Sequence, residues 1–264
     1  MTRVVGTVRG VKVRLVVAYD GTGFRGFARN DGVRTVMAVL TEAISLVVRA
    51  PVELTGAGRT DAGVHAWGQV VSGNLPEALE LDGLVRRLNK LCAPDIAVRS
   101  AEWVSDDFDA RFSALWRHYR YDVWNAPTPN PLLGGRVWWV SHPLDVGAMQ
   151  AACAVLIGEH DFSSFCRRVK VGDDEPEKSR VRQVISAGWS DVDIDHPGHL
   201  RFEIRANAFC HQMVRSIVGT LVDVGTGKIA GQRLRAILEA RSRESAGQVA
   251  PPRGLALWEV GYPS

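Results

Sequence analysis

The chain has 264 residues, of which 46% are hydrophobic and 23% charged, and its formal net charge at pH 7 is +3. Such a composition is typical of a globular protein with one large or two modest domains. No stretch approaches the roughly 18 uninterrupted apolar residues that a membrane-spanning helix requires, and residues 1–10 lack the apolar segment of a secretory signal. We therefore expect a cytoplasmic protein with no membrane partner.

Cysteine and histidine spacing gives no sign of a metal site. No C-x-x-C pair occurs, so we expect reduced, buried thiols at Cys92, Cys153, Cys166 and Cys210. His196 and His199 are separated by Pro-Gly, which indicates a turn, and no third ligand has suitable spacing. The sequence predicts no structural zinc.

The first half of the chain predicts a β-α-β-β-α-β order. After a loose leader at 1–10, residues 11–19 alternate as a strand, and Thr35 can cap a helix that ends before Pro51. Strands are expected at 52–54 and 67–71, with a glycine-rich loop from 56 to 67 between them. A helix over 79–91, with Leu84, Leu88 and Leu91 inward, and a strand over 96–104 complete the unit. This order is typical of a ferredoxin-like domain in which the loop joins the two middle strands.

The second half repeats the same order. Strands are predicted at 117–124, 181–189, 200–206 and 255–260, and helices at 209–224 and 232–240. Another helix begins at its cap Asp145 and is ended by Gly158, and a mobile charged loop spans 170–178. We predict an α+β protein with ferredoxin-like domains at 11–108 and 109–264, whose mixed or antiparallel sheets form a central catalytic cleft.

Polar side chains are concentrated in the glycine-rich loop. Residues 58–65 read Gly-Arg-Thr-Asp-Ala-Gly-Val-His, and a polar loop held between two strands is a common place for chemistry. An Asp and an Arg in such a turn can also serve only the loop itself. The glycine-rich segment at 21–32 also has two possible interpretations. Phe24 and Phe27 suit RNA contact beside the arginines there, or equally a loop that tucks both rings inward.

The loop resembles the signature of the TruA family of tRNA pseudouridine synthases, Gly-Arg-Thr-Asp-x-Gly-Val-His. Further similar segments are Tyr19-Asp20-Gly21, Phe108 to Tyr121, Gly158 to Phe165, Ala206 to Arg215 and Gly254-Leu255. The likeness spans residues 11 to the end. Phe27-Ala28 and Met37 depart from the family, which usually has Trp-Gln and Gln there, and this leaves open how the 21–32 loop grips RNA.

The resemblance implies an isomerase that converts uridine to pseudouridine at positions 38, 39 and 40 in the anticodon stem-loop of tRNA. Asp61 would be the catalytic nucleophile, and attack on the base, attack on the sugar and removal of a sugar proton all remain open. By resemblance Tyr119 stacks on the uracil, Arg215 pairs with Asp61, Arg59 displaces the flipped base, and Leu255 forms the other wall. The family also implies a homodimer.

Neither cofactor nor metal is expected, because the reaction is an internal rearrangement. His65 fits a hydrogen-bonded support of the loop as well as an active role, so it is not included among the catalytic residues. The alternative function is a non-catalytic RNA-binding protein built on the same domains. A carboxylate at Asp61 argues against it, since a carboxylate repels phosphate. A nucleotide-binding loop is excluded, because neither glycine-rich phosphate-binding motif is present.

Overall fold

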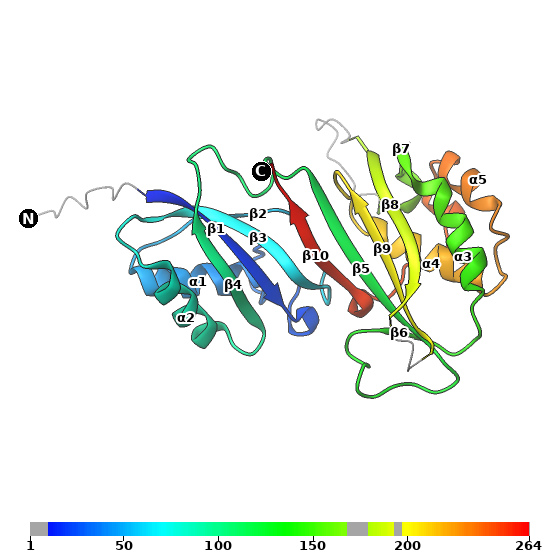
Figure 1. Cartoon of the computed structure of the whole chain (residues 1–264), viewed down its shortest axis with the longest axis horizontal. Helices are drawn as coiled ribbons and strands as arrows, with labels where there is room; N and C mark the ends of the chain where they lie inside the picture. Colours follow the sequence, from blue (N-terminus) through cyan, green and yellow to red (C-terminus); the bar gives the residue numbers. More distant parts are fainter. Residues whose placement is uncertain (1–9, 168–178, 193–196, 264) are drawn as a thin grey trace, which may run out of the picture. The chain divides into compact units, whose positions relative to one another are not determined.

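The structure is a computed structural model that describes residues 10–167, 179–192 and 197–263 (Figure 1). The chain divides into two compact units. Unit 1 contains residues 1–114 and 262–264, and unit 2 contains residues 115–261. The expected leader, the charged loop at 170–178 and His196 fall wholly or almost wholly outside the described residues. In the described part, no helix is both long enough and apolar enough to span a bilayer.

Unit 1 has the predicted β-α-β-β-α-β order. Its elements are β1 (Gly10–Tyr19), η1 (Gly21–Gly23), α1 (Val36–Val48), β2 (Leu54–Gly56), β3 (His65–Pro76), α2 (Leu81–Cys92) and β4 (Ile96–Trp103). The strands lie in the order β4-β1-β3-β2, and every neighbouring pair is antiparallel. This is the ferredoxin-like arrangement that the sequence predicts, with the signature loop between β2 and β3.

Capping residues explain where the two helices of unit 1 begin and end. Thr35 accepts a hydrogen bond from the Ala38 amide, as predicted, and Glu80 caps α2. Arg49 adopts a left-handed conformation (φ 56°) that ends α1 before Pro51. One prediction for α2 is wrong: Leu91 is 48% exposed. The buried face instead follows the four-residue spacing of Leu84, Leu88 and Cys92, and Leu91 lies at its margin.

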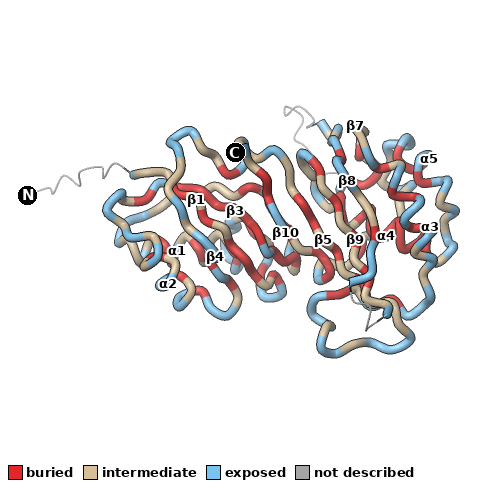
Figure 2. Tube along the Cα trace, in the orientation of Figure 1, coloured by how far each residue is buried: buried red, intermediate tan, exposed pale blue. Residues whose placement is uncertain are grey.

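The core of unit 1 lies between the sheet and its helices. Val13, Leu15 and Val17 alternate along β1 and are fully buried, as are Leu40 and Ile44 of α1. Figure 2 shows the buried segments along β1 and β3. Burying one such side chain stabilises a fold by about 1.5–3 kcal/mol. Phe24 and Phe27 are each 2% exposed, so the rings of the 21–32 loop turn inward.

Unit 2 is a second ferredoxin-like unit with additions. Its sheet contains β5 (Trp116–Asn125), β6 (Trp138–Val140), β7 (Gly158–Asp161), β8 (Val181–Asp191), β9 (His199–Ala206) and β10 (Leu255–Gly261). Its helices are α3 (Val146–Cys153), α4 (Met213–Gly225) and α5 (Arg233–Glu239), with short 3-10 turns η2 (Ala154–Leu156), η3 (Ser163–Phe165), η4 (Arg243–Ser245) and η5 (Pro252–Gly254).

The strand order β10-β5-β9-β8 is antiparallel throughout and matches that of unit 1. β7 extends the sheet beside β8, and β6 pairs in parallel with β5, so the sheet of unit 2 is mixed. The predicted α+β class is therefore confirmed. Gly158 begins β7 and does not end a helix, because α3 stops at Cys153 and a 3-10 turn follows. The helix predicted from 209 starts at Met213, because Gln212 has a φ of 65°.

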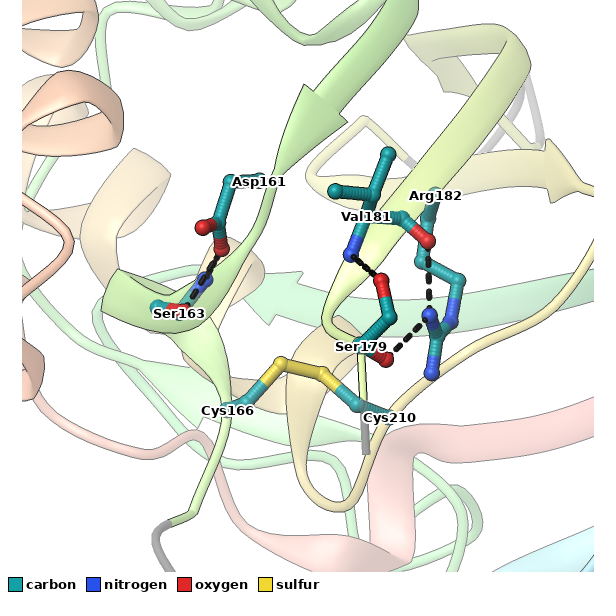
Figure 3. Close-up of a disulfide and its surroundings, with 7 residues drawn as sticks. All are labelled: Asp161, Ser163, Cys166, Ser179, Val181, Arg182 and Cys210. Atoms are coloured by element: carbon teal, nitrogen blue, oxygen red, sulfur yellow. Dashed lines mark hydrogen bonds between the residues drawn. A yellow bond between two sulfur atoms is a disulfide. The ribbon is translucent and has the colours of Figure 1, made fainter. Parts of the chain in front are cut away.

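Two of the four cysteines form a disulfide. Cys166 and Cys210 are joined with a Cα–Cα distance of 5.7 Å (Figure 3), which is within the usual range. The expectation of reduced thiols is wrong for this pair, since a sequence separation of 44 residues gives no sign of their proximity. Cys92 and Cys153 are free and buried, as expected. Burial raises the pKa of both thiols, that of Cys153 to about 12.

Candidate active site

The candidate loop connects two antiparallel strands of unit 1. β2 and β3 pair from Leu54–Gly73 to Gly56–Val71, and the chain between Gly56 and His65 forms the loop. The Val64 amide donates to the Asp61 carbonyl oxygen at 3.1 Å, which closes a tight turn around Asp61. Gly63 has a φ of 78°, a conformation that favours glycine. The predicted turn is thus present, although β3 begins at His65, inside the predicted loop.

The two charged side chains of the loop differ in exposure. Arg59 is exposed, whereas Asp61 is half-buried. The main chain of the loop is fixed next to Asp61, because the Phe27 amide donates to the Thr60 carbonyl oxygen at 3.1 Å. This bond links the candidate loop to the 21–32 loop. A half-buried carboxylate on a fixed main chain can act on a substrate that reaches it without first reorganising the loop.

His65 supports the loop through its ring. Its side chain is buried, and its Nδ1 accepts the Gly21 amide hydrogen at 3.1 Å. Nδ1 also lies 3.3 Å from the Asp20 carboxylate oxygen Oδ1. Gly21 must remain glycine, because a Cβ there would overlap the Val64 carbonyl group. Of the two roles that the sequence leaves open for His65, this geometry agrees with a hydrogen-bonded support of the loop.

Tyr119 lies within the sheet of unit 2. It sits on β5, opposite Leu257 of β10 and Ile204 of β9. The side chain is buried, and its ring meets the Phe209 ring edge-on with centroids 4.9 Å apart. Phe209 precedes α4, so the approach to this helix supplies the edge-on partner of the tyrosine ring.

Leu255 lies on the same face of the sheet as Tyr119. It opens β10 opposite Tyr121, which is two residues from Tyr119 on β5. Both side chains are buried, and the Tyr121 hydroxyl donates to the Pro251 carbonyl oxygen at 2.8 Å. Burial raises the pKa of Tyr121, while the cations Arg215 and Arg253 act in the opposite direction. Tyr121 therefore remains neutral and acts here as a hydrogen-bond donor.

Arg215 is held in place by the segment that leads to β10. It occupies the first turn of α4, and its Nε donates to the Ala250 carbonyl oxygen at 2.8 Å. The Ala250 amide returns a bond to the Arg215 carbonyl oxygen at 3.0 Å. The two residues are therefore linked in both directions, which orients the guanidinium group. The electrostatic effect on Tyr121 places this cation beside the tyrosine that faces Leu255.

The five predicted site residues form two groups. Asp61 and Arg59 belong to one loop of unit 1, and Tyr119, Arg215 and Leu255 belong to unit 2. Within unit 2 the three lie on the inner face of the sheet and at the start of α4. Tyr121 was not among the predicted site residues. It lies two positions from Tyr119 on the same strand, and residues two apart on a strand point to the same face, so this period could have identified it.

Comparison with known proteins identifies the family. The sequence profile of the family described as tRNA pseudouridine synthase matches residues 15–113 and 152–263. The chain belongs to this family. Its matched residues include the candidate loop and four of the five predicted site residues, Arg59, Asp61, Arg215 and Leu255, whereas Tyr119 lies between the two matched ranges. As a member of the tRNA pseudouridine synthase family the chain is an isomerase that acts on tRNA.

Individual members of the family are similar over nearly their whole length. A tRNA pseudouridine synthase A from Rhodospirillum rubrum is 42% identical over 254 residues, which cover 96% of this chain and 88% of the relative. A protein of the same name from Leifsonia xyli subsp. xyli is 41% identical, with 97% and 93% covered. Another from Frankia casuarinae is 43% identical, with 96% and 90% covered.

Proposed function

We propose that the protein isomerises uridine to pseudouridine at positions 38, 39 and 40 in the anticodon stem-loop of tRNA, with Asp61 as the catalytic nucleophile. The observation that carries this proposal is the unbroken family signature at residues 58–65, which lies on a loop fixed by main-chain bonds and presents a half-buried carboxylate. The choice of anticodon stem-loop positions depends on the resemblance to the family.

The other four residues have roles around the flipped uridine. Tyr119 stacks on the uracil and Leu255 forms the opposite wall, because a base taken out of its helix needs apolar or aromatic surfaces. Arg215 pairs with the Asp61 carboxylate and keeps it ionised. Arg59, the exposed cation next to the nucleophile, takes the place of the flipped base in the RNA helix.

The reaction breaks the N-glycosidic bond of uridine, turns the ring and rejoins it to the sugar through carbon 5 of the base. Every atom of the product comes from the substrate except one hydrogen: a hydrogen ion leaves carbon 5 as the new bond forms, and one is gained at the nitrogen released from the sugar. Neither an oxidant nor a group donor is required, so we propose that no cofactor takes part. A homodimer and a cytoplasmic location are also proposed, both by family resemblance.

Release of the hydrogen at carbon 5 supplies the test. Transcripts of tRNA labelled with tritium at this carbon release the label to water as pseudouridine forms. We expect Asp61→Asn to release no label, since an amide of the same shape is neither nucleophilic nor basic. Binding of tRNA should stay near the wild-type affinity or become tighter, because the variant removes a negative charge close to an anionic ligand.

Asp82→Asn is the matched control. Asp82 is exposed in the first turn of α2, in the same unit, so this variant makes the same charge change outside the loop. It should release label at the wild-type rate. Release by Asp61→Asn would assign the chemistry to another residue. Sequencing that locates pseudouridine in the transcripts tests the three proposed positions, and modification confined to other positions would contradict this part of the proposal.

A further inference from the structure

Two buried polar side chains of unit 1 contact the catalytic loop from the sheet beneath it. Tyr19, the last residue of β1, is 5% exposed, and Gln69 of β3 is completely buried. Burying a polar group without a partner costs roughly 1–3 kcal/mol in proteins. A buried glutamine within a strand therefore needs a hydrogen-bond partner, and both side chains form hydrogen bonds with residues of the loop.

Gln69 uses its amide to hold the loop to its own strand. Its Nε2 donates to the Gly58 carbonyl oxygen at 2.9 Å. Its Oε1 accepts from the Val70 amide at 3.2 Å, which fixes the orientation of the side-chain amide. The loop is thus bound at Gly58, one residue before Arg59.

Tyr19 binds the loop on the other side of Arg59. Its hydroxyl and the Thr60 hydroxyl are 2.8 Å apart. Burial raises the pKa of Tyr19, and hydrogen bonding with the Thr60 and Gln69 side chains acts in the opposite direction. The phenol therefore stays protonated, and the three side chains form one buried hydrogen-bonded cluster.

This cluster fixes the residue directly before the nucleophile. Thr60 is 7% exposed and is held both by the Tyr19 hydroxyl and, through its carbonyl oxygen, by the Phe27 amide. Because consecutive Cα atoms are about 3.8 Å apart across a trans peptide, fixing Thr60 leaves little freedom to the Asp61 backbone. Displacing a catalytic group by about 1 Å can cost about a hundredfold in rate.

We propose that Tyr19 and Gln69 are positioning residues of the isomerase: through Thr60 and Gly58 they set where the Asp61 carboxylate meets the target uridine. This inference depends on the proposed function of Asp61. Neither side chain touches the substrate. Their effect on the reaction is transmitted by the main chain of the loop, and tRNA binding does not depend on them.

The test changes one supporting side chain at a time. Tyr19→Phe deletes only the hydroxyl, and Gln69→Met replaces the amide with an apolar side chain of similar length. We expect the single-turnover rate of label release at saturating tRNA to fall about tenfold to a hundredfold in each variant. The dissociation constant for tRNA should remain within about twofold of the wild-type value.

Two matched controls in the same unit remove equivalent bonds elsewhere. The Tyr262 hydroxyl donates to the Ala110 carbonyl oxygen at 2.7 Å, so Tyr262→Phe repeats the first change. Asn89 bonds the Val98 amide and carbonyl oxygen through its side-chain amide, so Asn89→Leu repeats the second. Both controls should lose a similar amount of thermal stability but keep the wild-type rate.

Thr60 offers a second pair of variants that does not alter the sheet. Thr60→Val removes the hydroxyl and keeps the shape, whereas Thr60→Ser keeps the hydroxyl. We expect the valine variant to lose rate as Tyr19→Phe does, and the serine variant to recover most of it. Recovery of the rate in Thr60→Ser would show that the Thr60 hydroxyl is what matters, and a general loss of structure at this position would not explain it.

The outcomes separate this inference from the proposed function. A rate within about twofold of wild type in Tyr19→Phe and Gln69→Met, or a loss no larger than in the controls, would overturn the positioning role even with Asp61→Asn inactive. A loss of tRNA affinity that accounts for the whole effect would also overturn it. Label release by Asp61→Asn would instead overturn the proposed function of Asp61.

Discussion

Tyr119 combines two properties that separate variants can test, a ring and a hydroxyl. Tyr119→Phe retains the ring and its edge-on contact with Phe209. We expect this variant to bind tRNA with wild-type affinity, and to turn over more slowly if the missing hydroxyl handles a proton in the reaction. Tyr119→Ala should also lose the placement of the base, and about 3–5 kcal/mol of stability. Binding assays, single-turnover rates and urea unfolding measure the three effects.

Phe209→Leu is the control for the packing part of this prediction. It weakens the ring contact and leaves the Tyr119 hydroxyl in place. Its turnover should fall less than that of Tyr119→Phe. Wild-type turnover in both Tyr119 variants would show that Tyr119 is only a core residue of β5.

His118 makes the stability of unit 2 dependent on pH. It is buried on the face of β5 opposite to Tyr119, with its Nε2 3.2 Å from Glu203 Oε1. Burial lowers the pKa of His118. Glu203 and Glu259 raise it, and Arg120 and Arg205 lower it further, so the net direction is down. Below the usual histidine pKa of about 6.5, the unfolded chain therefore binds more protons at this position than the folded chain.

Stability due to His118 is complete above this usual pKa and is lost as the pH falls from about 6.5 toward the lower folded value. The slope is at most about 1.4 kcal/mol per pH unit for one group. We expect urea unfolding midpoints to decrease from pH 7.5 to pH 5.5, and His118→Gln to show a shallower decrease. An equally steep decrease in the variant would assign the pH dependence to other groups.

Single-residue interpretations of the sequence depend on how local the environment is. For His65 the position next to a glycine-rich turn allows a support role or an active role, and only the structure shows its hydrogen bond to the Gly21 amide. The positions of Phe24 and Phe27 stay open in the sequence, because their burial depends on residues distant in the chain. Leu91 is exposed because the buried face of α2 is rotated slightly about the helix axis from the predicted one, so that Cys92 is buried in its place. The supporting roles of Tyr19 and Gln69 give no signal in the sequence: Tyr19 lies in a segment that resembles the family, but each residue has the pattern of an ordinary strand residue.

At the level of elements, the disulfide joins the chain after η3 to the chain before α4. Cys166 and Cys210 close a loop with a sequence separation of 44 (Figure 3). The Arg167 amide donates to the His211 carbonyl oxygen next to them in the chain. Closing a loop of this length stabilises a protein by about 2–4 kcal/mol. We expect a reductant to lower the urea unfolding midpoint of the wild type, and to leave that of Cys166→Ser unchanged.

Thiol counting provides an independent measurement. Alkylation of the denatured chain without reductant should modify Cys92 and Cys153 only, and reduction should expose two more thiols. Cys92→Ala is the control, because it removes a free thiol and should respond to reductant as the wild type does. Four modified cysteines without reductant would contradict the pairing.

Long periodic elements could be predicted from the sequence, whereas short ones could not. β1, α2, β5 and β10 agree with their predicted ranges within about two residues, because hydrophobic period and capping are local properties. β6 and β7 contain only three and four residues, and they exist because a neighbouring strand offers hydrogen bonds. α4 begins at Met213 and not at the predicted residue 209, because Gln212 has a left-handed backbone conformation. The amino-acid composition of this segment does not indicate such a conformation.

For the whole molecule, the proposed rearrangement requires no external group. We expect full label release after exhaustive chelation and dialysis, provided that the tRNA is folded with monovalent salt and a polyamine. Adding back a divalent ion should not change the rate. A strict requirement for a divalent ion that polyamines do not replace would contradict the mechanism. Circular dichroism of the tRNA under both conditions is the control for its folding.

The order of the two ferredoxin-like units could be read from the sequence because each is a string of local patterns. Asp61 could be identified as a candidate only through the family signature, since periodicity alone predicts no more than a polar turn at this position. The supports beneath the loop could not be predicted, since Tyr19 and Gln69 lie 41 and 11 residues from their partners Thr60 and Gly58. Such distances in sequence are bridged only by the folded sheet.

Unit 1 is completed by residues that follow unit 2. The Tyr262 ring packs against Phe108 with centroids 5.0 Å apart and lies 5.7 Å from the Arg14 guanidinium carbon, while its hydroxyl binds Ala110. A ribosome makes about 5–20 residues per second, so the nascent unit 1 waits on the order of ten seconds for this ring. During that time Phe108 lacks its aromatic neighbour, so the last contact of unit 1 forms only after unit 2 has been synthesised.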